Sequence, residues 1–267
     1  MLTALALYVA LGLVAGILAG LLGIGGGLII VPMIHFALGV QGIRTEYNHH
    51  IALGTSLTTI IFTSVSSFMA HHRRGSVLWP VVFMLSAGVV AGTFGGVQVA
   101  KHIDGRYLQA FFICFLIYMG TQMLLNAKPK PSRALPGVAA NTGVGLIIGL
   151  VSSLVGIGGG SLTVPYLTWC NVPMLKAIGT SAAVGFFIAV AGAAGSIMAG
   201  WGVTGLPEWS FGFIYGPALL GIAGASVCTA PLGVKLANSL PVDRLKRFFA
   251  FFLYAVAAQM LYKIVTA

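Results

Sequence analysis

Charged residues are scarce in this 267-residue chain, since only 7% of its residues are Asp, Glu, Lys or Arg. Soluble globular domains carry roughly 25% charged residues, which they need to cover a water-facing surface. Hydrophobic residues make up 58% of the sequence, and the mean hydropathy is +1.00. The composition therefore excludes an ordinary soluble domain and predicts a protein whose solvent is lipid.

Acidic residues are the rarest charged group, because the chain has only four of them: Glu46, Asp104, Glu208 and Asp243. All four lie in loops or at the ends of apolar segments. Proton and cation pathways usually leave a carboxylate within the membrane, so we expect no carboxylate-based coupling. The 14 Lys and Arg residues occur singly or in short runs between apolar segments. That pattern is typical of topology signals in membrane loops and not of a nucleic-acid surface.

Cysteine is also scarce, and the three cysteines are far apart without a C-x-x-C spacing. We interpret them as small buried hydrophobic residues and expect no metal site. The sequence also lacks a zinc motif, a G-x-S-x-G turn and a pair of acids that could share a reacting bond. These absences predict that the protein is not an enzyme, with no catalytic residues and no cofactor.

Apolar segments occupy most of the chain and are interrupted by short polar connections. Their lengths are suited to α-helices that cross or enter a bilayer. The predicted segments are Ala4–Leu22, Gly26–Leu38, His50–Ala70, Leu78–Val99, Tyr107–Leu125, Val138–Val155, Gly159–Trp169, Lys176–Ala199, Phe211–Ala237 and Arg244–Val265. The sequence thus predicts an all-α polytopic membrane protein.

The two halves of the sequence carry the same motifs in the same order. The glycine-rich stretch Gly23–Gly27 recurs 133 residues later as Gly156–Gly160, and the Gly-Thr-Ser triplet at Gly54 recurs 125 residues later at Gly179. Preserved order with slowly drifting offsets indicates an internal duplication. The predicted units are an N-terminal transmembrane repeat, a linker and a C-terminal transmembrane repeat, at residues 1–125, 126–137 and 138–267.

The relative orientation of the repeats follows from length and charge. As one straight helix, Ala4–Leu38 would be about 52 Å long, whereas the hydrocarbon core is about 30 Å thick. Reversal of the chain at the glycines removes this mismatch and predicts two inverted repeats, each a Gly-broken helical hairpin plus three transmembrane helices. Ten Lys and Arg residues then share one side and four the other, whereas unbroken spans would give eight and six. The positive-inside rule places the basic side in the cytoplasm and both termini outside.

Each glycine-rich stretch is expected to form a turn between two half-helices. Glycine permits positive φ angles and close approach of other groups. The helix that follows begins with unpaired N–H groups and the positive end of its dipole, a combination that binds anions in inverted-repeat transporters. We expect Pro32 and Pro165, at matching positions, to break these helices. The alternatives are helix packing through small residues and, less well supported because the motif lysine is missing, a nucleotide-binding loop.

The repeated Gly-Thr-Ser triplets add uncharged hydroxyl donors. These hydroxyls could bind an anion, or they could bond to their own helix backbone, as is common in membrane helices. The predicted substrate-binding residues are Gly23, Gly25, Gly26, Gly27, Thr55, Ser56, Gly156, Gly158, Gly159, Gly160, Ser161, Thr180 and Ser181.

All six histidines lie in the first half of the chain. The pairs His49-His50 and His71-His72 bracket one predicted span, and His35 lies near the end of another. We expect them to be interfacial side chains at helix ends. The alternative is that the pairs titrate with pH.

Two G-x-G-G-G…V-P segments, each followed by G-T-S on the next helix, resemble the sulfite exporter TauE/SafE family of membrane transporters. The resemblance covers essentially the whole chain, and the doubled pattern carries it. It implies a bacterial or archaeal inner-membrane permease for sulfite or small organosulfonates such as sulfoacetate, with the glycine turns and the hydroxyl pairs at the site. One departure is Tyr47–His50, whose counterpart around Met174–Lys176 is dissimilar.

The sequence therefore predicts a multi-pass secondary transporter of the inner (plasma) membrane. Its substrate would be a small sulfur-containing anion, held where the paired glycine turns meet near the midplane, with alternating access. The expected partners are that anion and the lipid bilayer, with no nucleic acid, and a homo-oligomer stays open. A passive anion channel and a non-transporting membrane scaffold are the alternative functions.

Overall fold

The computed structural model describes residues 2–22, 26–43, 45–125, 134–239 and 242–266, most of which are helical. The helices of the first half are α1 (Leu2–Leu22), α2 (Gly27–Val40), α3 (Asn48–Arg73), α4 (Trp79–Lys101) and α5 (Gly105–Leu124). Those of the second half are α6 (Val138–Val155), α7 (Gly160–Trp169), α8 (Met174–Gly200), α9 (Gly216–Ser239) and α10 (Val242–Thr266). A short antiparallel ribbon of β1 (Ser210–Phe211) and β2 (Ile214–Tyr215) precedes α9.

Six helices in the described part of the chain are long and apolar enough to cross a membrane. They are α3, α4, α5, α6, α8 and the segment Arg247–Ile264 of α10. Shorter apolar stretches lie in α1, α2 and α9. The chain is therefore an all-α, multi-pass membrane protein, as its composition predicts.

The predicted start of the ninth segment is wrong, because the chain forms the β1–β2 ribbon where a helix was expected from Phe211. Gly212 has a positive φ of 58°, which a right-handed helix does not allow. The N–H of Phe213 instead donates to the carbonyl of Ser196 in α8, at 3.1 Å. Helix α9 begins only at Gly216.

The prediction that Pro32 and Pro165 break the helices is also wrong. Pro32 lies inside α2 and Pro165 lies inside α7, and both helices continue past them. A proline removes the main-chain hydrogen bond to the carbonyl four residues earlier but leaves the remaining bonds in place. The conformational break occurs upstream, at the left-handed glycines Gly26 and Gly159.

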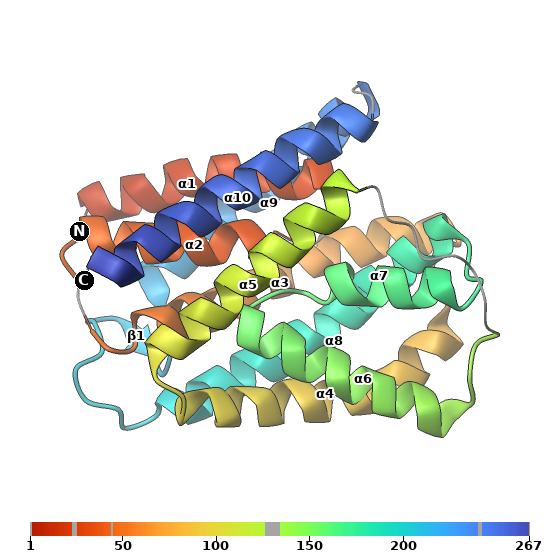
Figure 1. The fold of residues 1–267 in the computed structure, drawn as a ribbon, viewed down its shortest axis with the longest axis horizontal. Coiled ribbons are helices and arrows are strands. Elements are labelled where there is room, and N and C mark those ends of the chain that lie inside the picture. Colours follow the sequence, from red (N-terminus) through yellow and green to blue (C-terminus); the bar gives the residue numbers. More distant parts are fainter. Residues whose placement is uncertain (1, 23–25, 44, 126–133, 240–241, 267) are drawn as a thin grey trace.

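The helices form one bundle with both chain ends at the same end (Figure 1). Helices α1 and α2 run in opposite directions, and so do α6 and α7 (Figure 1). The connections after α3 and α7 lie at the end of the bundle away from the termini (Figure 1).

Contacts between the two halves occur in exchanged pairs. Helix α1 packs on α9, and α6 packs on α4; helix α4 packs on α8, and α9 packs on α3. Helix α3 packs on α8 and α5 on α10, each against its own counterpart in the sequence pattern. The helices of the two halves are therefore interleaved and share a single core.

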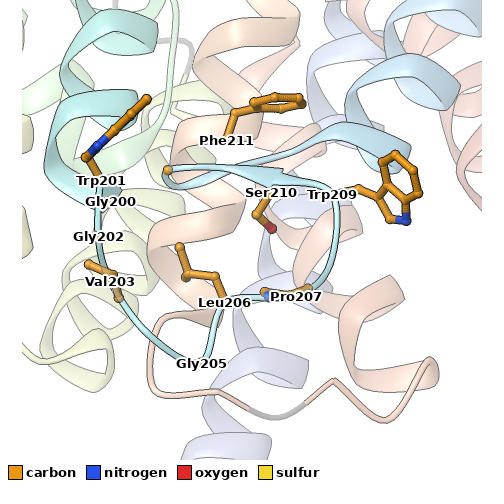
Figure 2. Close-up of a pocket in the computed structure, with 11 residues that line it drawn as sticks. Gly200, Trp201, Gly202, Val203, Gly205, Leu206, Pro207, Trp209, Ser210 and Phe211 are labelled. Carbon is orange, nitrogen blue, oxygen red and sulfur yellow. The ribbon is translucent and has the colours of Figure 1, made fainter.

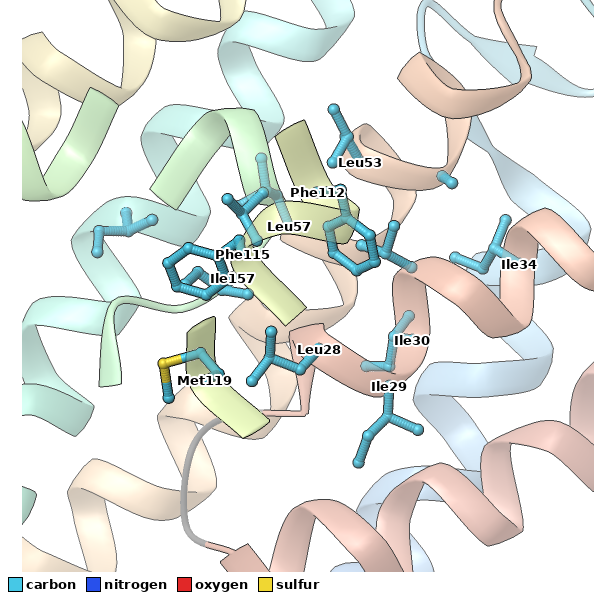
Figure 3. Close-up of a cluster of buried hydrophobic side chains, with 14 of the residues drawn as sticks. Leu28, Ile29, Ile30, Ile34, Leu53, Leu57, Phe112, Phe115, Met119 and Ile157 are labelled. Carbon is cyan, nitrogen blue, oxygen red and sulfur yellow. The ribbon is translucent and has the colours of Figure 1, made fainter. Parts of the chain in front are cut away.

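A cluster of buried aliphatic and aromatic side chains fills the space between α2, α3 and α5 (Figure 3). Ile157, which lies in the turn between α6 and α7, is 1% exposed and belongs to this cluster. Phe115 and Met119 of α5 and Leu28 of α2 surround it in Figure 3. The core of the first half thus receives a residue from the glycine turn of the second half.

Candidate functional site

The second glycine turn joins α6 to α7 through two left-handed residues. Gly156, with a φ of 70°, ends α6, and the N–H of Ile157 donates to the carbonyl of Ser152 at 3.0 Å. This pairing is the Schellman pattern of a helix C-terminus. Gly159, with a φ of 75°, immediately precedes α7, and its carbonyl accepts the first main-chain bonds of that helix. Left-handed conformations are accessible to glycine without a steric penalty.

The first glycine turn shows the same geometry at the start of α2. Gly26 has φ 76° and ψ −12°, and Gly159 has φ 75° and ψ −12°. The N–H groups of Ile29 and Ile30 donate to the Gly26 carbonyl, both at 3.0 Å. The predicted site residues Gly23 and Gly25 lie outside the described residues. Helices α2 and α7 therefore begin in the same way, as the repeated motif predicts.

The two turns are in contact with each other. A methyl group added at Gly27 would lie 2.5 Å from the carbonyl oxygen of Gly156 and 2.8 Å from the Cα of Ile157. The same Gly156 carbonyl accepts a 2.9 Å hydrogen bond from the Oγ of Ser56 in α3. Predicted site residues from both halves, Gly27, Ser56 and Gly156, thus meet in one place.

The second turn is enclosed by neighbouring helices. Gly158 lies against Ile60 of α3, and a methyl group at Gly185 of α8 would lie 2.5 Å from the Gly158 carbonyl. Residues Gly156 to Gly159 are all buried. The structure therefore shows a conformation in which the turn is shielded from solvent.

Three buried hydroxyls beside this turn have no hydrogen-bond partner among the described residues. They are the Oγ of Ser161 and the Oγ1 of Thr163, on the first turns of α7, and the Oγ of Ser152 on α6. Gly159 has no side chain to cap the first N–H groups of α7, which lack intrahelical acceptors. Buried polar side chains without a protein partner are rare, so each of these hydroxyls is a candidate donor to a ligand, water or ion. The start of α7 can therefore donate several hydrogen bonds to a small anion.

The two predicted threonines serve the packing between the halves. Thr55 Oγ1 accepts a 3.0 Å hydrogen bond from the N–H of Tyr215, just before α9. Thr180 Oγ1 accepts one from the N–H of Leu78, just before α4, also at 3.0 Å. Both acceptor oxygens are thus occupied by main-chain donors of the opposite half.

The two predicted serines differ from each other. Ser56 donates to the second glycine turn, whereas Ser181 Oγ donates to the carbonyl of Ile178 in its own helix, at 3.0 Å. The glycines of the Gly-Thr-Ser triplets, which we did not predict as site residues, have a clear packing role. Methyl groups at Gly54 and Gly179 would each lie 2.5 Å from a carbonyl oxygen, of Phe213 and Ser76 respectively.

Several histidines are buried and not interfacial as we expected. His49 is 2% exposed and His50 5% exposed, although both lie in the first turn of α3. The interfacial interpretation overlooked that α2 and α5 cover this turn, with His35 of α2 and Phe112 of α5 against the His49 ring. The sequence carries no local signal for this burial, since it depends on contacts between distant segments.

A cavity of about 380 Å³ lies in the loop between α8 and α9 (Figure 2). The side chains of Trp201, Leu206 and Trp209 line it together with the backbone of several glycines. The predicted site residues are not part of its lining. The cavity and the glycine turns are therefore separate features.

The described residues contain no group of three or more His, Cys, Asp or Glu that could hold a metal ion. The three cysteines are free thiols, and only Cys170 is buried; the interpretation as buried residues is wrong for Cys114 and Cys228, which are exposed.

The described helices form a multi-pass membrane bundle, and comparisons with known proteins place it in the class of membrane transporters. Residues 8–260 match the family model described as sulfite exporter TauE/SafE. The chain therefore belongs to the TauE/SafE family, as its motifs suggested. No solved structure matches the chain.

Similar proteins from distant organisms bear transporter names. A "Probable membrane transporter protein" of Haemophilus influenzae is 37% identical over 98% of this chain and 100% of its own length. The "Probable membrane transporter protein YunE" of Bacillus subtilis is 29% identical over 73% of this chain and 78% of its own. A relative from Methanocaldococcus jannaschii, also named as a probable membrane transporter, is 27% identical over 91% of this chain and 90% of its own. These names point to transport and not to an enzyme.

Proposed function

We propose that this protein is a secondary transporter that moves small sulfur oxyanions, such as sulfite or an organosulfonate, across the inner (plasma) membrane. The description of its family as sulfite exporters supports this class of substrate. The observation that carries the proposal is the start of α7, where a left-handed Gly159 lies beside the unpartnered hydroxyls of Ser161 and Thr163.

The chemistry of this site suits a compact oxyanion. Sulfite and sulfonate groups carry several acceptor oxygens, and the site offers them main-chain N–H donors, hydroxyls that can donate, and the positive end of a helix dipole. Hydrogen bonds from neutral donors to a charged ligand are stabilising, and Gly159, Ser161 and Thr163 carry no formal charge. Such a site favours binding that is weak enough to allow release.

Alternating access between inverted repeats is the mechanism we propose. The exchanged pairs of helix contacts and the equal geometry of Gly26 and Gly159 support a two-fold relation between the halves. The opposite directions of α1 and α6 in Figure 1 support inversion. The buried second turn corresponds to an occluded conformation, so the halves must move apart to expose it on either side.

The same proposal includes an orientation of the protein in the membrane, which follows from the positions of its basic residues. The ends of α3, α8 and α10 that carry Arg73, Lys176 and Arg247 lie away from the chain termini (Figure 1). The positive-inside rule assigns this end to the cytoplasm and the termini to the outside.

The test is flux of radiolabelled sulfite and of methanesulfonate into liposomes that contain the purified protein. Thr163→Val and Ser161→Ala remove unpartnered hydroxyls, whereas Thr168→Val, the matched control on α7, removes one that bonds within its own helix. We expect the KM to rise about tenfold or more in the first two variants, since a hydrogen bond to a charged group contributes about 1.5–3 kcal/mol. The control should transport like the wild type.

Other outcomes decide against the proposal in distinct ways. Wild-type protein that is folded but moves neither anion contradicts the proposed substrate class. Normal kinetics in both Thr163→Val and Ser161→Ala contradict the site. Flux that only dissipates a gradient and never accumulates substrate identifies a passive channel.

A further inference from the structure

Two histidines from different helices meet within the first half, where His49 is buried and His35 is partly exposed. The ring centroids of His35 in α2 and His49 in α3 are 6.1 Å apart, with the rings edge to face at 69°. Neither nitrogen of His49 has a hydrogen-bond partner among the described residues, and Nδ1 of His35 also lacks one. His49 is 2% exposed, so water on the protein surface does not satisfy it.

Packing alone does not account for a histidine at position 49. A neutral imidazole has one donor and one acceptor nitrogen, and a protonated one has two donors. Each buried polar group left without a partner costs about 1–3 kcal/mol, whereas an apolar side chain of similar shape would avoid this cost. The surroundings already include the ring of Phe112, 5.8 Å from the His49 ring centroid. An aromatic hydrocarbon side chain would therefore fit the cluster better.

The histidine pair is also not required by the fold, because the second half lacks it. At the repeat offsets, His35 corresponds to Thr168 and His49 corresponds to Met174. Thr168 satisfies its hydroxyl within α7, and Met174 is 48% exposed. Because the histidine pair is present in only one of two matching halves, it indicates a function that each molecule needs only once.

Charged and titratable groups approach the pair from several sides. Lys263 of α10 interacts electrostatically with His35, and its Nζ lies 5.4 Å from the ring centroid of the adjacent Phe36. His50, next to His49 on α3, bonds through Nε2 to the carbonyl of Ala100 at 3.0 Å. Glu46, before α3, and Asp104, before α5, interact electrostatically with His50.

We infer that His35 and His49 form a proton-binding site that couples proton movement to the transport cycle. This inference rests on the proposed function, since it assigns a coupling ion to the same transporter. In the conformation seen here His49 is shielded from solvent, and a second positive charge near Lys263 is unfavourable. When a conformational change lets water reach His49, the imidazolium gains hydrogen-bond acceptors. Proton occupancy and conformation are therefore linked, because the proton binds one conformation more tightly than the other.

Methanesulfonate allows a clean test of coupling because it does not titrate near neutral pH. A pH gradient across the proteoliposome membrane should drive wild-type accumulation of radiolabelled methanesulfonate above its equilibrium level. His49→Gln, with His49→Phe as a second variant in case the first folds poorly, should keep downhill flux but lose this accumulation. His102→Gln, at an exposed position, is the matched control and should behave like the wild type. Accumulation that persists in both His49 variants, or is absent from a wild type that transports downhill, overturns the inference.

A second measurement separates this site from the proposed function. If neither the wild type nor any variant moves anions downhill, the transport proposal is wrong. Nuclear magnetic resonance of histidine-labelled protein in nanodiscs then tests the proton-binding site by itself. A His49 imidazole signal that titrates between about pH 5 and 8 and responds to His35→Gln supports the pair. A His49 signal that keeps its neutral form and ignores His35→Gln overturns it.

Discussion

The hydroxyl oxygen of Thr180 accepts a hydrogen bond from the main-chain N–H of Leu78, 102 residues away in the sequence, at 3.0 Å. Thr55 makes the equivalent bond with the N–H of Tyr215, also at 3.0 Å. Leu78 and Tyr215 directly precede α4 and α9, the fourth helices of the two halves. Each threonine therefore holds the start of a helix from the opposite half against the central pair α3 and α8.

The first prediction concerns these threonine bonds. Thr55→Val and Thr180→Val keep the side-chain shape but leave a main-chain N–H without its acceptor, which should lower the free energy of unfolding by about 1–3 kcal/mol each. Thermal unfolding in detergent measures the loss, and Thr→Ser at the same positions, which keeps the oxygen, should restore most of it. Valine variants as stable as the wild type would show that the bonds contribute nothing.

The second prediction concerns the glycines that precede these threonines. Gly54→Ala and Gly179→Ala each place a methyl group 2.5 Å from a carbonyl oxygen, of Phe213 and Ser76, which forces the backbone apart. We expect both variants to unfold at clearly lower temperature, in the range of about 1–3 kcal/mol for overpacking. Gly95→Ala in α4 is the control, since nothing lies within 4 Å of its added methyl, and it should be neutral or slightly stabilising. Equal behaviour of all three variants would contradict the close approach.

Much of the fold is predictable from the sequence because its signals are local. Apolar runs set the helices, and the doubled glycine motif predicts two equivalent helix starts, which Gly26 and Gly159 then adopt within one degree of φ. The ribbon before α9 is not predictable in this way. It forms because Phe213 bonds to Ser196 of another helix, a contact that no run of hydrophobicity encodes.

The candidate site is less predictable because its partners are distant in the chain. A hydroxyl that binds a ligand and one that caps a helix start look identical in the sequence, so Thr180 and Ser161 could not be told apart. The structure separates them, since Thr180 has a main-chain partner and Ser161 has none. The burial of His49 depends likewise on tertiary contacts with α2 and α5.

The third prediction tests the contact between the two glycine turns. Gly27→Ala places a methyl group against the Gly156 carbonyl and Ile157, so the turns must separate by a few tenths of an ångström or more. We expect lower stability, by about 1–3 kcal/mol, and a loss of saturable anion flux. Gly39→Ala is the matched control on α2, because its methyl would lie 3.7 Å from Lys263 Nζ at ordinary contact distance. Wild-type flux in Gly27→Ala would show that transport tolerates separated turns.

The fourth prediction distinguishes two roles of Gly159. An added methyl group there contacts the Cδ1 of Ile188, and the left-handed backbone disfavours any side chain, so Gly159→Ala suffers both a clash and backbone strain. Ile188→Val removes the Cδ1 atom and should itself cost about 0.5–1.5 kcal/mol. In the Ile188→Val background, Gly159→Ala should therefore lower the free energy of unfolding by less than in the wild type. About 1–2 kcal/mol should remain, which is the strain of a left-handed residue.

Unfolding free energies of the wild type, both single variants and the double variant give this coupling directly, and anion flux is measured beside them. If strain at Gly159 sets the direction of the α7 N–H groups, flux should stay impaired in the double variant even though the clash is gone. Full recovery of flux in the double variant would mean that Ile188 packing, and not the left-handed turn, limits transport. A Gly159→Ala variant that costs nothing in either background would contradict the left-handed conformation itself.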